Sequence, residues 1–380
     1  MKILIVGAGI SGLTLGAFLE DSSVEFEIIE KASDWNHQGF LIGIWENGRA
    51  ILEKLGLAPI FDASGSAVQK YSIRNGKGSL LRNYDLSSFY VNYGGAVRLI
   101  ERADLHTWLF GKISSQKIQM GVTIDTISQT SEKVQIKFNN GRTGEYDLIV
   151  GADGVHSSVR NLVFGQQQFE SYDNWRVWCV WIDKKFDTVG TITEYVEPRE
   201  LSVVFSAGEK AMAWLVAPEN HASWDTEQGR ADRLKQIFKD ETMLMPKLLE
   251  KINDSQILPT DLLDIRLKTW TMGRVTLAGD AAHSFGPHAG MGGSMAMEDG
   301  YILAGELMQV SENYSLSQAL KQYEQKRKKR IKITTNLSHR LRRYTLIKSK
   351  ILRKTIDFFI PFVPARFLTS DYDLLLKEKL

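Results

Sequence analysis

The sequence has little cysteine and no long apolar run, and both absences limit what the chain can be. Cys179 is the only cysteine in 380 residues, which rules out an intrachain disulfide and suits a reducing compartment. No stretch approaches the ~20 apolar residues that a transmembrane helix needs. The apolar part of the N-terminus, MKILIVGAGI, is too short for a signal peptide. We therefore expect a cytoplasmic protein that does not span a membrane.

Charge is nearly balanced, and no metal-ligating cluster is evident. A formal net charge of +2 argues neither for nor against nucleic acid, and no nucleic-acid recognition motif accompanies it. His283 and His288 have no metal-ligating partners at a useful spacing. We therefore predict neither a nucleic-acid partner nor a metal.

The pattern along the chain is that of an α/β protein. Lys2 to Val6 is a continuous apolar run, Ile10 to Leu19 has helical character, and Val24 to Glu30 is again strand-like. These segments predict a strand–helix–strand unit and a parallel sheet. Strand-like runs broken by turn signals cover 68–95 and 170–218, and they predict a second, antiparallel sheet.

Helices dominate the later part of the predicted structure. Residues 226–252 are predicted to be helical, and so is the stretch from Ser294 to about Leu346. Between them, Arg274 to Ala278 has the composition of a buried strand.

A glycine-rich turn, GAGISG, joins the first strand to the first helix. Gly7 permits the tight turn, Gly9 lets a pyrophosphate approach the backbone, and Gly12 lets helix and strand pack closely. The helix N-terminus offers free N–H groups and a positive dipole end to phosphates. Glu30 ends the second strand, where a carboxylate would bind an adenosine ribose. The pattern predicts dinucleotide binding without separating FAD from NAD.

A second glycine-rich segment follows the buried strand near residue 275 and precedes the next helix. An Asp at such a strand end can bind a polyol hydroxyl, and a helix N-terminus can face an electron-rich ring or a phosphate. Two nucleotide-contacting loops so far apart in the chain favour FAD, with its ribitol and isoalloxazine, over NAD. The turn and loop residues are Gly279, Asp280, Pro287, Gly290, Gly292 and Gly293.

A third segment, Asp147 to Arg160, has the sequence DLIVGADGVHSSVR. It predicts a strand, a turn that holds Asp153 and Gly154, and a helix capped by Ser157. Along the chain GAGISG comes first, DLIVGADGVHSSVR second and the segment that begins at Gly279 third. With the three segments in this order, the chain resembles the class A FAD-dependent aromatic-ring monooxygenases, which are similar to p-hydroxybenzoate hydroxylase. The resemblance covers roughly residues 1–330.

The resemblance implies a Rossmann-like FAD-binding domain interleaved with an antiparallel-sheet substrate domain, followed by C-terminal helices. The segments expected are 1–67, 96–169 and 268–310 for the FAD-binding domain, 68–95 and 170–267 for the substrate domain, and 311–380 for the helical region. The chain lacks the thioredoxin-like domain of the phenol-hydroxylase branch, so we expect the compact branch that includes tetracycline-inactivating enzymes.

The same resemblance implies an enzyme that binds FAD and uses NADPH or NADH transiently. The nicotinamide would reduce FAD, O2 would form a flavin hydroperoxide, and its distal oxygen would pass to an aromatic or polycyclic small molecule. Glu30 would bind the adenosine ribose, Arg102 the phosphates and ribitol, and Asp280 the ribitol. Because the flavin carries the chemistry, no catalytic side chain is assigned. The cofactor-binding residues so implied are Gly7, Gly9, Ile10, Ser11, Gly12, Glu30, Lys31, Arg102, Asp153, Gly154, Gly279, Asp280, Pro287, Gly290, Gly292 and Gly293.

Aromatic residues crowd the region 170–218, which could form one wall of a substrate pocket. In the strand-like run 175–181, odd-numbered residues would share one face, and that face could line a pocket for a planar substrate. A position in the hydrophobic core is an equally good interpretation for either tryptophan of that face, Trp175 or Trp181. The candidate substrate residues are Trp175, Trp181 and Phe285.

Other functions share the predicted cofactor site. An FAD-dependent reductase or dehydrogenase would use the same loops without oxygen transfer, and a non-catalytic FAD-binding protein would need no turnover. A flavin halogenase is disfavoured, because its GWxWxIP motif is absent and Asn174 to Trp178 is a poor substitute.

The last sixty residues are rich in Lys and Arg and then in Phe. Basic residues run from Lys326 to Lys354, and Phe358 to Phe362 follow. One interpretation is a long helix with a solvated basic face and an apolar face that bridges the domains. The other is weak contact with an anionic membrane surface.

Overall fold

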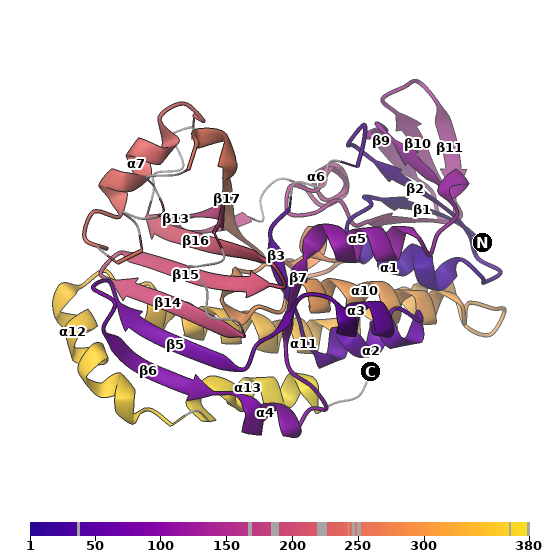
Figure 1. Ribbon diagram of the computed structural model, residues 1–380. Coiled ribbons are helices and arrows are strands. Elements are labelled where there is room, and N and C mark those ends of the chain that lie inside the picture. Colours follow the sequence, from indigo (N-terminus) through magenta and orange to yellow (C-terminus); the bar gives the residue numbers. More distant parts are fainter. Residues whose placement is uncertain are drawn as a thin grey trace.

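The computed structural model describes residues 1–35, 39–165, 169–183, 190–218, 226–241, 243–244, 248, 252–364 and 366–377. Figure 1 shows a parallel sheet on the right, which carries the N-terminus, beside a larger sheet on the left. The helices α10 (Gly292–Leu307) and α11 (Leu316–Thr345) lie beneath the junction between the two.

The first sheet has the strand order β18-β19-β12-β1-β2-β8, and every pair except β18–β19 is parallel. β1 and β12 are almost completely buried, because a parallel strand covered on both faces needs apolar side chains on both. The predicted N-terminal unit is confirmed, since α1 (Ile10–Leu19) links β1 to its parallel neighbour β2. The strands are β1 (Lys2–Val6), β2 (Glu25–Glu30), β8 (Ile118–Met120), β12 (Leu148–Gly151), β18 (Thr271–Met272) and β19 (Val275–Leu277).

The second sheet has seven strands in the order β17-β13-β16-β15-β14-β5-β6. All of its pairs are antiparallel except β5–β14, through which the early segment of the chain joins strands that come much later. The predicted interleaving of the two sheets is therefore confirmed as a feature of the fold, while the domain boundaries stay a prediction. The strands are β5 (Lys70–Asn75), β6 (Leu80–Asp85), β13 (Phe169–Ile182), β14 (Thr191–Glu197), β15 (Glu200–Ala207), β16 (Lys210–Pro218) and β17 (Ile257–Ile265).

Alternation along β13 divides the core in two. Trp178 and Val180 pack on one face in a cluster that includes residues of α7 (Arg230–Ile237). Val177 and Cys179 belong to the larger core on the opposite face, as expected for neighbouring residues of a strand. Figure 1 shows helices on both sides of this sheet, with α7 above it and the C-terminal helices below.

Two small antiparallel sheets and several helices complete the described fold. The small sheets are β9 (Ile124–Gln129), β10 (Val134–Phe138) and β11 (Thr143–Tyr146), and β3 (Leu41–Ile44), β7 (Arg98–Glu101) and β4 (Ser66–Ala67). The remaining helices are α2 (Glu46–Lys54), α3 (Ala58–Ala63), α4 (Ser87–Val91), α5 (Arg102–Phe110), α6 (Ser158–Phe164), α9 (Asp280–His283), α12 (Lys350–Phe359) and α13 (Arg366–Leu376), with short 3-10 turns at η4 (Pro287–Ala289) and η5 (Ile360–Phe362).

Two helix predictions were wrong in extent. In 226–252 the described helix α7 ends at Ile237, and much of 242–251 lies outside the described residues. The helix predicted from Ser294 to about Leu346 is broken between α10 and α11. Ser315 caps α11 by accepting a hydrogen bond from the Gln318 backbone N–H, while the Gln318 side chain returns to the Ser315 N–H. Apolar periodicity on both sides of the break concealed it. None of the described helices is long and apolar enough to cross a membrane.

Close contact between α1 and α10 depends on Gly300. A Cβ at this position would lie 2.7 Å from the Leu15 backbone nitrogen and 2.8 Å from the Ser11 carbonyl oxygen. The backbone of α1 therefore occupies the space that any side chain would need. Because α1 begins at the glycine turn, α10 holds that turn in place.

We expect Gly300→Ala to lower the free energy of unfolding by about 1–3 kcal/mol, because the added methyl group must displace backbone. Gly305→Ala, in the same helix, is the control, since no atom lies within 4 Å of its added Cβ. This control should be neutral or stabilising by roughly 0.5–1 kcal/mol. Urea unfolding measures both variants, and equal destabilisation by the two would contradict the prediction.

Candidate functional site

The glycine turn between β1 and α1 adopts a conformation that only glycine tolerates. Gly7 has φ +104°, and a Cβ there would lie 2.5 Å from the Ala152 carbonyl oxygen. A Cβ at Gly12 would lie 2.1 Å from the Gly7 carbonyl oxygen. The first turn of α1 holds no acidic side chain, and no side chain caps it. Its N–H groups and positive dipole end are therefore available to an anion.

Glu30 is fixed beside this turn by the backbone. Its Oε2 accepts a hydrogen bond from the Ala8 N–H at 2.9 Å, and its Oε1 accepts one from the Ala32 N–H at 3.0 Å. The carboxylate thus faces the entrance of α1, where the predicted ribose contact requires it. Lys31, the next residue, is exposed.

Arg102 and Asp280 bring opposite charges to the middle of the cleft. Both line one hollow together with the start of α1. Burial lowers the pKa of the Arg102 guanidinium, whereas the carboxylates of Asp280 and Glu30 favour its charged form. Enclosure by the cleft walls raises the pKa of the Asp280 carboxyl, and the charges of His283 and Arg102 oppose that rise. The pair offers a cation and a hydrogen-bond acceptor to a polar ligand.

The cleft has a volume of about 300 Å³ and runs from the glycine turn to the loop before α10. At several glycines of the cleft, the space around a Cβ position is empty and open to a ligand. A Cβ at Gly154 or Gly292 would meet no atom within 4 Å, and at Gly9 the nearest atom would be 3.9 Å away. The buried Ser11 hydroxyl, which lines the cleft, has no hydrogen-bond partner. An extended dinucleotide such as FAD fits this combination of open glycines, free N–H groups and an unsatisfied hydroxyl.

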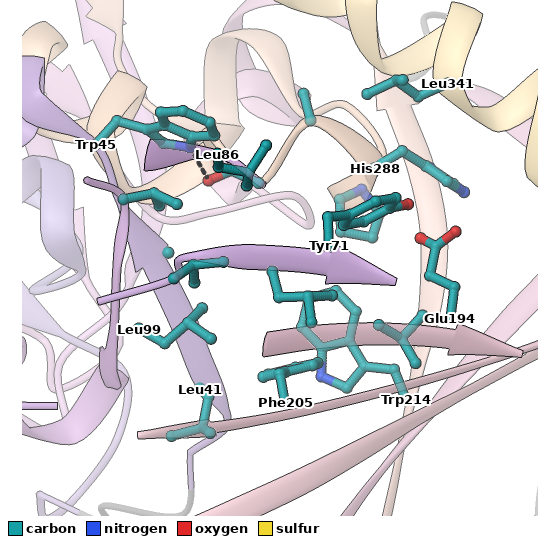
Figure 2. Close-up of a pocket in the computed structure, with 18 of the residues that line it drawn as sticks. Leu41, Trp45, Tyr71, Leu86, Leu99, Glu194, Phe205, Trp214, His288 and Leu341 are labelled. Atoms are coloured by element: carbon teal, nitrogen blue, oxygen red, sulfur yellow. Dashed lines mark hydrogen bonds between the residues drawn. The ribbon is translucent and has the colours of Figure 1, made fainter. Parts of the chain in front are cut away.

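A second cavity, of about 210 Å³, adjoins the cleft and shares part of its wall. Aromatic and aliphatic side chains make up most of its wall, and Figure 2 shows Trp45, Phe205 and Trp214 around it. The Trp45 indole N–H donates to the Gly290 carbonyl at 3.0 Å, which fixes the loop between the two hollows. The residues that line both hollows are Gly43, Val177, Trp214, Leu262, Pro287 and Gly290.

Comparison with known proteins identifies the family. The model of the FAD binding domain family matches residues 1–338. The chain belongs to this family. The resemblance to FAD-dependent monooxygenases, predicted from three sequence segments, is thereby confirmed.

Relatives of this FAD-binding protein match over most of both lengths. The FAD-dependent urate hydroxylase of Klebsiella pneumoniae subsp. pneumoniae is 27% identical over 339 residues, which are 87% of each chain. The aurachin C monooxygenase/isomerase of Stigmatella aurantiaca is 29% identical over 314 residues, 80% of each chain. The solved structure of Klebsiella pneumoniae HpxO complexed with FAD and uric acid has a TM-score of 0.89 at 22% identity, covering 99% of this chain and 97% of that one. This last likeness shows the fold.

Most residues predicted to hold the cofactor line the cleft of this FAD-binding protein. Gly7, Gly12 and Glu30 shape or flank the turn without lining the cleft, while Asp153 caps α6 by accepting from the Ser158 N–H at 2.7 Å. The predicted cofactor residues that do line the cleft are Gly9, Ile10, Ser11, Arg102, Gly154, Gly279, Asp280, Pro287, Gly290, Gly292 and Gly293. Phe285, which was predicted as a substrate residue, lines the same cleft.

The substrate wall differs in detail from the expectation. Trp175 is buried in the core. The Lys210 ammonium lies over the Trp181 ring, 5.7 Å from the ring centre. Neither tryptophan is among the lining residues of the two hollows, whereas Val177 and Cys179 from the same strand are. Phe205 and Trp214, from the aromatic-rich region 170–218, do line the cavity. The other aromatic lining residues come from separate segments and were not predicted. They are Trp45, Tyr71, Tyr84, Phe89, Tyr90 and Tyr372.

A buried ion network holds the floor of the FAD cleft. Glu298 and Asp299 on α10 are fully buried and meet Arg327 and Arg330 on α11. Arg327 Nε donates to Asp299 Oδ1 at 2.6 Å, and its Nη1 donates to Glu298. Arg330 Nε donates to Glu298 Oε2 at 2.8 Å. Arg327 and Arg330 in the basic segment of α11 are thus buried and paired, rather than part of the solvated basic face that one interpretation of the sequence expected.

The same network positions the loop that carries Asp280. Asp299 Oδ2 accepts from the Gly279 N–H at 2.7 Å and contacts His283 Nε2 at 2.5 Å. Burial alone would raise the pKa of Asp299, but the charges of His283 and Arg327 lower it to about 2. The carboxylate is therefore ionised throughout the neutral range, and it fixes the strand end from which Asp280 enters the cleft.

Arg327→Met and Lys326→Met form a matched pair, because each removes one cation of α11 that pairs with a carboxylate of α10. Arg327→Met should cost about 3–5 kcal/mol of stability, since it leaves buried charges without their partner. Lys326, whose side chain is 54% exposed, meets Glu306 at 2.6 Å, and Lys326→Met should cost ~1 kcal/mol or less. Urea unfolding at neutral pH tests both, and similar losses would refute the role given to the network.

Proposed function

We propose that this protein is an FAD-dependent monooxygenase that uses NADPH or NADH and O2 to hydroxylate an aromatic or polycyclic small molecule. The observation that carries the proposal is that the dinucleotide cleft shares part of its wall with a cavity lined mostly by aromatic and aliphatic side chains. Urate and aurachin C are named for two relatives, and both names support an aromatic substrate class.

In this proposal each part of the cleft holds one part of FAD. The N–H groups that open α1 bind the pyrophosphate, with Gly7, Gly9 and Gly12 shaping the turn. Glu30 binds the adenosine ribose, helped by the neighbouring Lys31. Arg102 and Asp280 bind the phosphates and the ribitol. The loop 287–293 would hold the flavin ring, and Asp153 and Gly154 would contribute to the contacts with FAD and the nicotinamide.

When bound, FAD supplies the redox chemistry and the activation of oxygen. The chain's own residues have the task of binding, orienting and excluding water. Val177, Trp214 and Leu262 stand where the cleft meets the cavity, so they would hold a flat substrate beside the ring. The aromatic wall excludes water from that contact. An FAD-dependent reductase would use the same cleft without transferring oxygen to its substrate.

The purified protein should be yellow, lose its colour anaerobically with NADPH or NADH, and regain it in air while an aromatic substrate gains one atom from ¹⁸O-labelled O2. Asp280→Ala should weaken FAD binding about tenfold, because it removes a charged acceptor. Asp232→Ala, which alters an exposed carboxylate of α7, should retain FAD. The visible spectrum and mass spectrometry of the product measure these outcomes.

A colourless protein that cannot be reconstituted with FAD would overturn the proposal entirely. Bleaching and recolouring that yield only peroxide, with every aromatic compound tested, would favour the reductase. An FAD dissociation constant in Asp280→Ala that equals that of the unaltered protein would refute the role of that residue alone.

We infer in addition that α12 and η5 contact an anionic membrane surface. Apolar side chains here are 51–81% exposed. Exposed apolar patches of this kind normally mark a contact surface. Exposed lysines lie beside them and complement negatively charged headgroups. The apolar residues are Ile351, Leu352, Phe358, Phe359 and Phe362, and the lysines are Lys348, Lys350 and Lys354.

The protein should float with vesicles that contain phosphatidylglycerol and not with vesicles of phosphatidylcholine alone. A Phe358→Ser/Phe362→Ser variant should lose most of this binding, because its apolar anchor is gone. Val91→Ser is the control, since Val91 is 82% exposed elsewhere on the molecule. Absence of binding by the unaltered protein, or undiminished binding by the double variant, would overturn the inference.

A further inference from the structure

One end of the aromatic cavity is polar. Figure 2 shows Tyr71, Glu194 and His288 gathered at this end, away from Trp45 and Leu41. They come from three elements, β5, β14 and η4. Tyr71 and Glu194 lie on neighbouring parallel strands, and the Tyr71 hydroxyl favours the charged form of the Glu194 carboxyl. The remaining wall is mostly aliphatic and aromatic, and in it the Tyr90 hydroxyl and the Trp214 Nε1 also lack a hydrogen-bond partner.

Two buried atoms at the polar end have no hydrogen-bond partner. They are Glu194 Oε2 and His288 Nδ1. Glu194 is only 9% exposed, so its free oxygen has lost water without gaining a donor from the protein. A buried acceptor left in this condition is costly, and a ligand that donates a hydrogen bond removes the cost. The unsatisfied Glu194 Oε2 therefore indicates that the cavity receives a ligand with a hydrogen-bond donor.

The charges around this end further restrict the ligand. None of the described residues that line the cavity is Lys or Arg. Arg353, on α12, is the cation that acts on Glu194, and it is already paired with Asp357 at 2.6 Å. Arg342 and His339, both on α11, favour the neutral form of the His288 ring. A carboxylate ligand would thus meet Glu194 without gaining a cation inside the cavity.

Protonation at this end is set by burial. Burial raises the pKa of Glu194 to about 7, against the effects of Tyr71 and Arg353. Burial lowers the pKa of His288 to about 3, and Arg342 and His339 act in the same direction. The His288 ring is therefore neutral near pH 7.

Tyrosines complete the set of titratable groups at this end. Burial raises the pKa of Tyr71 well above its ordinary value, and Glu194, Tyr372 and Tyr84 add to that rise. Tyr71 therefore stays protonated, so Glu194 is the group there that changes charge near neutrality.

The geometry points to Glu194 as the residue that selects the substrate: the cavity takes an uncharged aromatic molecule with one hydroxyl or N–H group, which donates to Glu194 Oε2, and it excludes aromatic carboxylates. This inference rests on the proposed function and narrows its substrate class. The apolar wall receives the rings, and Glu194, the acceptor that is ionised at pH 8, fixes which end of the molecule points away from the cleft.

Three probes of similar size test the selection by equilibrium dialysis against the FAD-loaded protein: 2-naphthol, 2-methoxynaphthalene and 2-naphthoate. At pH 8 we expect 2-naphthol to bind about tenfold or more tightly than either of the others, because only it donates to an ionised acceptor. Its affinity should fall several-fold from pH 8 to pH 6, as Glu194 gains a proton on passing through pH ~7.

Glu194→Gln should bind 2-naphthol more weakly and without this pH dependence, while its affinity for 2-methoxynaphthalene stays the same. Glu197→Gln is the matched control, because it makes the same change on the same strand and Glu197 does not line the cavity. It should behave like the unaltered protein. The conservative replacement keeps the shape of the side chain, and retained FAD reports that each variant is folded.

Equal binding of 2-naphthoate and 2-naphthol, or a pH dependence that survives in Glu194→Gln, would overturn the inference. The dialysis measures binding without turnover. Selective binding of 2-naphthol by a protein that transfers no oxygen would therefore support this inference and contradict only the proposed function.

Discussion

A buried cluster of four charged side chains holds together the parts of the molecule that border the FAD cleft. Glu298 and Asp299 on α10 face Arg327 and Arg330 on α11. Because an unpaired charge is so costly in the interior, the two helices are held where every charge has its partner. Asn47 of α2 donates to Glu298 at 2.6 Å, and Arg330 donates to the Leu375 carbonyl of α13 at 2.7 Å. Elements distant in sequence are thus tied to one helix.

The helix α10 also positions the glycine turn before α1 and the backbone at Gly279. α10 packs against α1 at Gly300, and it binds the backbone of Gly279 through Asp299. The two segments that we propose to contact FAD, the glycine turn and the Gly279 strand end, are therefore positioned by one helix. The cavity beyond them is built by the other sheet, so the junction of the two sheets is where cofactor and substrate would meet.

Local sequence signals predicted the glycine turn beside the cleft, because two of its glycines answer to a backbone requirement. Gly7 and Gly12 lie where a Cβ would collide with backbone, and a collision of this kind leaves a readable motif. The interleaved fold followed from the order of strand-like segments. The end of α10 was missed, because periodicity continues across the break and only the Ser315 capping box signals it.

The substrate cavity was harder to predict because its wall is assembled by tertiary contacts. Trp175 and Trp181 were chosen by alternation along one strand, yet the described cavity receives Val177 from that strand and Trp214 from its neighbour. Tyr71, Glu194 and His288 are far apart in the sequence, and no local pattern joins them. The buried pairing of Arg327 and Arg330 was hidden for the same reason, since a run of basic residues gives no indication of which members face a carboxylate across the core.

The most direct test of the account is a crystal structure of the FAD-loaded protein with 2-naphthol. The account predicts that the flavin ring lies between the loop 287–293 and Val177, with the naphthol beside it in the cavity lined by Trp214. Flavin density that lies away from this loop, or a ligand outside the aromatic cavity while that cavity stays closed to the cleft, would contradict it.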